Sequence, residues 1–194
     1  MDADWEVEIG AGAQVIEADW QGFIDLRTHP ECVHEIAEAA AFPPLADLLL
    51  VLNAANSPLW TSKCDLWEPE PSALASYPAE LASYIDLLPI EGRVFAHWQQ
   101  AEAFCREYVA RLAPIALPEC GEEPSRHSSP ECTIALVIRQ ALAGDTEGFA
   151  ITAYLSARSD SQTGAATALA AAMAVFADAL PAAAPPATVG SRLQ

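Results

Sequence analysis

The chain has 194 residues, 52% of them hydrophobic, with 27 acidic side chains against 9 basic ones and a formal net charge of −18. The length suits one domain, and the apolar share excludes an intrinsically disordered protein. A negative field of this size repels phosphate backbones and anionic lipid surfaces, so we expect neither nucleic-acid nor membrane binding. The opening MDADWEVEIG lacks the features of a signal peptide, and none of the five cysteines forms a C-x-x-C pair. These features predict a soluble cytoplasmic protein with free thiols.

The first elements are predicted to be strands. Trp5, Val7 and Ile9 alternate with Glu6 and Glu8, which is typical of a half-buried strand. The glycines of GAG provide a turn, and QVIEADW and GFIDL predict one or two further strands of a meander.

Two helices are predicted next. Thr28 and Glu31 have the spacing of a capping box, which predicts a helix from about His29 to Ala41. Pro44 suits the first turn of a second helix through LADLLLVLNAA.

The middle of the chain predicts two strands and a long helix. SPLWTSKCDLWEP is typical of a strand, an acidic proline-broken connection follows, and SYIDLLP predicts a short strand. Gly92 precedes an amphipathic helix that should end before Pro114. Its predicted buried stripe is Phe95, Trp98, Cys105, Tyr108, Val109 and Leu112.

The last third predicts a long loop, a hairpin and a helix. Residues 114–131 show no period, and loops of this length are commonly functional or disordered. TIALVIRQAL and GFAITAYLSA flank AGDTEG as the strands of a hairpin. A Ser159–Gln162 capping box then starts an alanine-rich helix, with Leu169, Met173, Phe176 and Leu180 on one side.

This order of elements predicts an α+β fold, with a largely antiparallel or mixed sheet and helices packed on one face. The C-terminal part has the order of a β-α-β-β-α unit of split βαβ type. We expect one domain over residues 1–181, with a possible subdivision near 68–82, and a flexible tail over residues 182–194.

The sequence contains two cysteine–histidine arrangements. His29, Cys32 and His34 resemble a zinc set, but on a helix His29 and His34 point in different directions, so no metal site is predicted. His127 in the long loop could serve Cys120 or Cys64 as the base of a cysteine hydrolase. A solvent-exposed loop histidine is the simpler interpretation.

Three aspartates end similar stretches: Asp25 in FIDL, Asp65 in KCDL and Asp86 in YIDL. If these strands lie side by side, the carboxylates could converge and bind Mg²⁺. The chain has no Walker loop and no G-x-G-x-x-G motif, so we predict no cofactor. The structural alternative is that Asp86 pairs with Arg139, which interrupts an otherwise apolar strand.

The stretch WTSKCDLW contains the only lysine of the chain, Lys63. In a regular strand, Thr61, Lys63, Asp65 and Trp67 share one face, while Trp60, Ser62, Cys64 and Leu66 share the other. The alternation of a regular strand therefore disfavours a Lys–Cys–Asp catalytic trio. A cation, an anion and an aromatic plane on one face suggest a recognition patch, and the alternative is a solvated strand face with a surface ion pair.

The sequence contains no recognised catalytic signature. We expect a binding or accessory module whose partner is a small molecule or a protein. The alternative is a small enzyme, a hydrolase or a metal-dependent enzyme, that uses Lys63 and Asp65 with Asp25 or Asp86. The candidate ligand-binding residues are Thr61, Lys63, Asp65, Trp67, Asp86, His127 and Arg139.

Overall fold

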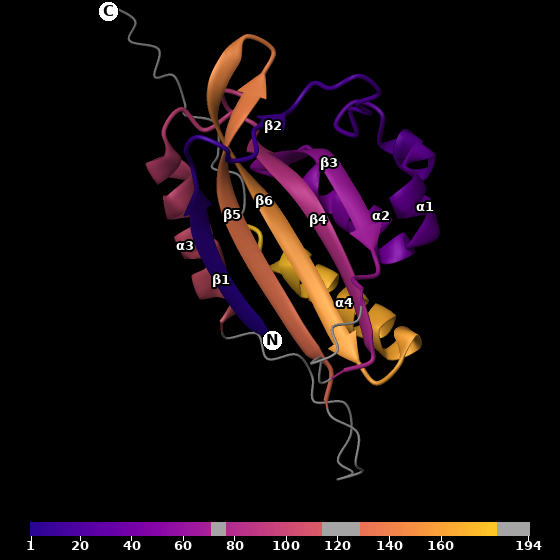
Figure 1. The fold of residues 1–194 in the computed structure, drawn as a ribbon. Coiled ribbons are helices and arrows are strands. Elements are labelled where there is room, and N and C mark those ends of the chain that lie inside the picture. Colours follow the sequence, from indigo (N-terminus) through magenta and orange to yellow (C-terminus); the bar gives the residue numbers. More distant parts are fainter. Residues whose placement is uncertain (71–76, 114–128, 182–194) are drawn as a thin grey trace, which may run out of the picture.

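A computed structural model of the chain describes residues 1–70, 77–113 and 129–181, and has an α+β fold (Figure 1). The strands are β1 (Asp2–Glu8), β2 (Ile16–Glu17), β3 (Leu59–Trp67), β4 (Ala79–Pro89), β5 (Glu131–Ala143) and β6 (Thr146–Ser159). The helices are the 3₁₀ helix η1 (Pro30–Glu35) and the α-helices α1 (Ala37–Ala41), α2 (Pro43–Leu52), α3 (Trp98–Leu112) and α4 (Gln162–Asp178). The predicted fold class is confirmed.

The strands form one mixed sheet in the order β1-β5-β6-β4-β3, with the short β2 also paired to β5. β1 and β2 run parallel to β5, and the other neighbouring pairs are antiparallel. Because β4 and β5 are each antiparallel to β6, they are parallel to one another with β6 between them. The connection β4-α3-β5 around β6 is therefore a split βαβ unit, as the order of elements predicted.

The β5–β6 hairpin is the longest pairing in the sheet and forms its centre. Its loop has two residues, Gly144 and Asp145, and Gly144 has a φ of +60°, which favours glycine at the first position of so short a turn. Alternation along both strands follows from the pairing, so Ile134, Leu136 and Ile138 lie on one face together with Leu155.

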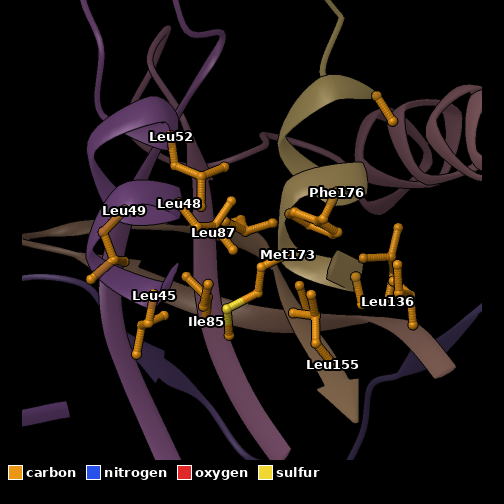
Figure 2. Packing of buried hydrophobic residues seen from close by; sticks show 14 of the residues in the cluster. Leu45, Leu48, Leu49, Leu52, Ile85, Leu87, Leu136, Leu155, Met173 and Phe176 are labelled. Carbon is orange, nitrogen blue, oxygen red and sulfur yellow. The ribbon is translucent and has the colours of Figure 1, made fainter. Parts of the chain in front are cut away.

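The main core fills the space between this face and the helices. Figure 2 shows leucines of α2 facing Met173 and Phe176 of α4 above the strand residues Ile85, Leu87 and Leu155. α3 adds Cys105, Tyr108 and Leu112, all buried, and the Tyr108 and Phe176 rings meet edge to face with centroids 4.8 Å apart. Burial of these side chains is the dominant stabilising term of the fold.

The N-terminal third differs from the prediction. GFIDL is not a strand, and QVIEADW contributes only the two residues of β2. The predicted helix from His29 to Ala41 is replaced by η1 and the short α1. Thr28 Oγ1 does not cap a helix but donates to the carbonyl of Asp25 (3.1 Å), in a turn where that carbonyl also accepts from the backbone N–H of His29 (2.9 Å). The Glu31 carboxylate meets His29 Nδ1 (3.2 Å) instead of reaching back to the cap, so the capping box does not form.

The starts of α3 and α4 also need correction. α3 begins at Trp98 with His97 as its cap, Phe95 forms a β-bridge with Phe149 before the helix, and Trp98 is 36% exposed. α4 is capped by Ser161, whose side chain accepts from the backbone N–H of Gly164 (3.1 Å), and not by Ser159. The other residues of the two predicted buried stripes belong to the core or pack against it. Most of the predicted 114–131 loop and the tail lie outside the described residues.

Candidate functional site

None of the helices in the described residues lies on the second face of the sheet (Figure 1). β1 contributes four acidic side chains to it, because Ala3 and Trp5 point to the helices. We call this surface the open face. Its side chains are Asp2, Asp4, Glu6 and Glu8 of β1, Thr133, Ala135, Val137 and Arg139 of β5, Thr152, Tyr154, Ser156 and Arg158 of β6, Glu80, Ala82, Tyr84 and Asp86 of β4, and Lys63, Asp65 and Trp67 of β3.

One end of this side of the sheet is covered by the segment that runs from Gly10 to Arg27. A second, smaller hydrophobic cluster forms there around Ile16, Ala18 and Trp60. The Trp60 indole N–H donates to the carbonyl of Pro89 (3.1 Å), and Phe23 packs edge-on against its ring. This cover ends at the level of Arg139 and Asp86. No other described helix or strand packs on the open face.

Three aromatic rings from three neighbouring strands form a row across the open face. The ring centroids of Trp67 and Tyr84 are 6.2 Å apart, and those of Tyr84 and Tyr154 are 6.1 Å apart. All three side chains are half-buried against one another. Their same-face neighbours Ala82 and Ser156 are small, so the rings stand above the surface around them.

Asp86 lies beside this row and is only 4% exposed. Its Oδ1 accepts a hydrogen bond from Thr152 Oγ1 (2.7 Å). Among the described residues, no lysine, arginine or histidine lies within ion-pair distance of the Asp86 carboxylate. Desolvation raises the pKa of Asp86, and the hydrogen bond from Thr152 and the more distant charges of Lys63 and Arg139 only partly oppose this. The open face thus has a buried acid near its centre.

Arg139 is on the same face as Asp86, but the two do not pair as the sequence suggested. The guanidinium donates to Glu8 Oε2 from Nε (2.9 Å) and Nη2 (2.7 Å), and to the Tyr154 hydroxyl from Nη1 (2.9 Å). It reaches Asp86 only through Thr152, at 3.4 Å. The reason is the parallel β1–β5 pairing, which sets Glu8 directly beside Arg139. Glu8 and Tyr154 could not be identified from the sequence, because that register is set by tertiary structure.

A β-bulge changes the predicted face assignment of WTSKCDLW. Thr61 pairs with Leu87 and Cys64 with Ile85, so three steps along β3 match two along β4. Lys63, Asp65 and Trp67 stay on the open face, and Cys64 points to the core as predicted. Thr61, however, lies on the helix side.

Asn53, the residue that ends α2, holds Thr61 there. Its Nδ2 donates to Thr61 Oγ1 (2.7 Å) and its Oδ1 accepts from the Thr61 backbone N–H (3.1 Å). Thr61 is buried and is therefore removed from the set of candidate ligand contacts.

Lys63 and Asp65 do not form the surface ion pair that was the alternative to a recognition patch. The Lys63 ammonium lies 5.8 Å from the ring centroid of Trp20, which belongs to the covering segment. Asp65 Oδ1 accepts from the backbone N–H of Leu66 (2.7 Å). Trp20 was not among the predicted site residues, since only the folded segment brings it next to β3.

The three aspartates do not converge. Asp65 and Asp86 share the open face and both raise the pKa of Tyr84, for which desolvation is the larger cause. Asp25 forms a bidentate ion pair with Arg27 (2.8 Å for both contacts), which lowers the pKa of this carboxyl. Within residues 1–70, 77–113 and 129–181, no three His, Cys, Asp or Glu side chains are grouped so that they could hold a metal ion.

The thiols on β3 and α3 are unreactive in character. Burial raises the pKa of Cys64 and of Cys105 to about 12, so both are protonated at neutral pH. Cys120 and His127 lie outside the described residues, and the cysteine–histidine hypothesis gains no support from Cys64.

Comparison with known proteins yields no relative: no family model, no curated protein and no solved structure matches this chain. None of the helices in the described ranges is long and apolar enough to cross a membrane.

Proposed function

We propose that this protein is a binding module and that the open face is its contact surface for another protein. The observation that carries the proposal is the row of Trp67, Tyr84 and Tyr154 on a sheet face that no described helix covers. Tryptophan and tyrosine are enriched in protein interfaces and dominate their binding energy, because they bury a large area with few rotatable bonds.

The extent of the surface favours a protein over a small ligand. The open face runs across five strands, while small-molecule sites are concave and enclose most of the ligand. A depression along the outer side of α3, between Gln99 and Ala110, is lined by that single helix. It offers no convergent groups from a second element.

A photo-crosslinker placed on the open face tests the proposal. Tyr84 would be replaced by p-benzoylphenylalanine, with the same replacement at Ala103, which is exposed on α3, as the control. After irradiation in an extract of the cells that make the protein, position 84 should give a discrete protein adduct and position 103 should not.

A second substitution makes the crosslinking test quantitative. Trp67→Ala should reduce the adduct at position 84 by roughly tenfold or more, as expected for an interface residue of the hot-spot class. Trp98→Ala, which removes a tryptophan on the helix side, should leave it unchanged. Equal adducts at positions 84 and 103, or none at 84, would contradict the proposal.

A small enzyme remains the second candidate, and one observation favours it: Asp86 is a buried acid with a raised pKa, a property that is common in catalytic acids. In this version Asp86 and Asp65 act with Lys63, and Asp25 is not involved because Arg27 neutralises it. A thermal-shift screen of wild type and Asp86→Asn against divalent metals, nucleotides and small metabolites tests this version. A ligand that raises the melting temperature of wild type alone would support it.

A further inference from the structure

We infer that the partner presents a positively charged protein surface to the open face. This inference rests on the proposed function and specifies the chemistry of its partner.

Both arginines of the open face are already ion-paired. Arg139 is paired with Glu8 (2.7 Å) and Arg158 with Glu80 (3.0 Å). In contrast, Asp2, Asp4 and Glu6 have no ion-pair partner among the described residues, and all three are exposed. Since alternate residues of a strand point to the same side, these carboxylates form a line along β1, roughly 7 Å from one to the next.

Strand pairing places the acidic line of β1 level with the aromatic row on β6 and β4. Asp4 is paired with Ala135, Ala135 with Tyr154 and Tyr154 with Tyr84, all in one row across the sheet, and Asp65 continues this row on β3. A ring pair is thus bordered by a carboxylate at each end. Arginine and lysine are the side chains that satisfy both kinds of neighbour, because their cations stack on aromatic faces while pairing with carboxylates.

Asp86 adds a second, independent indication on the same face of β4 as Tyr84. This carboxylate is buried, has one hydrogen bond, from Thr152, and has no cation within ion-pair distance in the described part of the chain. A buried carboxylate is costly unless it is paired. A guanidinium or ammonium group that entered over Tyr84 would supply the missing charge.

The same charges disfavour the other occupants of an uncovered sheet face. A second copy of this chain would set one acidic line against another, and like charges that face each other in an interface are destabilising. A nucleic acid would meet the same repulsion from the chain's net charge of −18. Lys63, the one cation of the open face that is not ion-paired in the described residues, lies at the β3 edge over Trp20, away from the acidic line on β1.

The test uses two synthetic twelve-residue peptides on the isotope-labelled 194-residue chain. One peptide alternates arginine with glycine and tyrosine, and the other replaces every arginine with glutamate. Amide chemical shifts recorded by NMR during the titration map where each peptide binds. We expect the arginine peptide to shift amides of β4, β5 and β6 around Tyr84, Ala135 and Tyr154, and the glutamate peptide to shift none of them.

A pair of matched charge variants separates a specific surface from general attraction to an acidic protein. The double variant Asp4→Asn with Glu6→Gln should weaken binding of the arginine peptide by about fivefold or more. Each exposed charge pair contributes modestly to the binding free energy, and the variant removes two. Asp47→Asn with Asp178→Asn removes the same charge from exposed sites on α2 and α4, and should change the affinity by less than about twofold.

Equal losses in the two double variants, or shifts that map to the helices, would overturn the inference. Its failure is distinguishable from failure of the proposed function. If crosslinking at position 84 captures a protein whose contact surface is acidic or neutral, the open face is a docking surface and only the cationic partner is wrong. If sedimentation shows a dimer that Tyr84→Ala dissociates, the partner is a second copy and this inference is wrong.

Discussion

The two faces of this sheet differ in how their side chains are satisfied. On the helix-covered face, Leu87, Leu136 and Leu155 are fully buried among the side chains of α2 and α4. On the open face, side chains are buried only in part, by contact with neighbouring side chains of the same face, as Tyr84 is by Tyr154. The first arrangement stabilises the fold through area removed from water, and the second leaves aromatic and charged groups available. If the proposed function holds, stability and recognition are assigned to opposite sides of one sheet.

The largest expected effect is on the covered face. Phe176→Ala should lower the free energy of unfolding by about 3–5 kcal/mol, because it removes a fully buried ring that packs on Tyr108 and leaves a cavity. Urea denaturation followed by circular dichroism measures this. Tyr84→Ala, an aromatic truncation on the open face, should cost less than half as much. Equal losses would mean that the open face belongs to the core and would remove the distinction between the faces.

A smaller loss of stability is expected at the β-bulge of β3, where Thr61 lies on the helix side. Asn53→Ala should cost about 1–3 kcal/mol, because it leaves the backbone N–H of the buried Thr61 without its acceptor. Val51→Ala, an exposed position on the same helix, should change stability by less than about 0.5 kcal/mol. If both variants unfold alike, the hydrogen bonds from Asn53 do not hold Thr61 on the helix side.

Asp86 should make stability depend on pH in a way that an apolar face would not. Its pKa is raised in the folded protein, so the folded state binds the proton more tightly than the unfolded state. Wild type should therefore lose stability relative to Asp86→Asn as the pH rises through this raised pKa. The two should approach each other again below the ordinary aspartate pKa of about 4.

Urea titrations of wild type and Asp86→Asn at several pH values measure this difference, and each unit of pKa shift corresponds to about 1.4 kcal/mol. The amide keeps an oxygen acceptor for Thr152, which makes Asp86→Asn the conservative variant. Parallel stability profiles would show that Asp86 is not desolvated on folding.

The smallest expected effect is at Lys63. Lys63→Ala should change the free energy of unfolding by no more than about 0.5–1 kcal/mol, the contribution of an exposed cation–π contact such as the one with Trp20. Thermal unfolding monitored by tryptophan fluorescence provides the measurement. A loss as large as that of Asn53→Ala would mean that Lys63 holds the covering segment in place.

Local patterns predicted most of the elements correctly. The alternation of TIALVIRQAL and GFAITAYLSA predicted the hairpin, and the spacing of Leu169, Met173 and Phe176 predicted the buried side of α4. Such patterns involve neighbours in the chain, so a single sequence contains them. The capping box predicted at Thr28 was wrong, although it too was read from neighbouring residues. A short polar motif specifies a local hydrogen bond, and the Asp25 turn offered Thr28 a competing acceptor.

The sequence by itself determined the α+β class, the side chains that alternate along each strand, and the presence of Lys63, Asp65 and Trp67 on one strand face. Apart from the β5–β6 hairpin, only the tertiary structure decided which strands are neighbours. The parallel pairing of β1 with β5 assigned Glu8 rather than Asp86 to Arg139, and the β4–β6 pairing brought Tyr84 to Tyr154. The physical reason is that pairing depends on hydrogen bonds and packing between segments far apart in the chain. A one-residue bulge in β3 then moved Thr61 to the opposite face, and no local alternation indicates where such a bulge occurs.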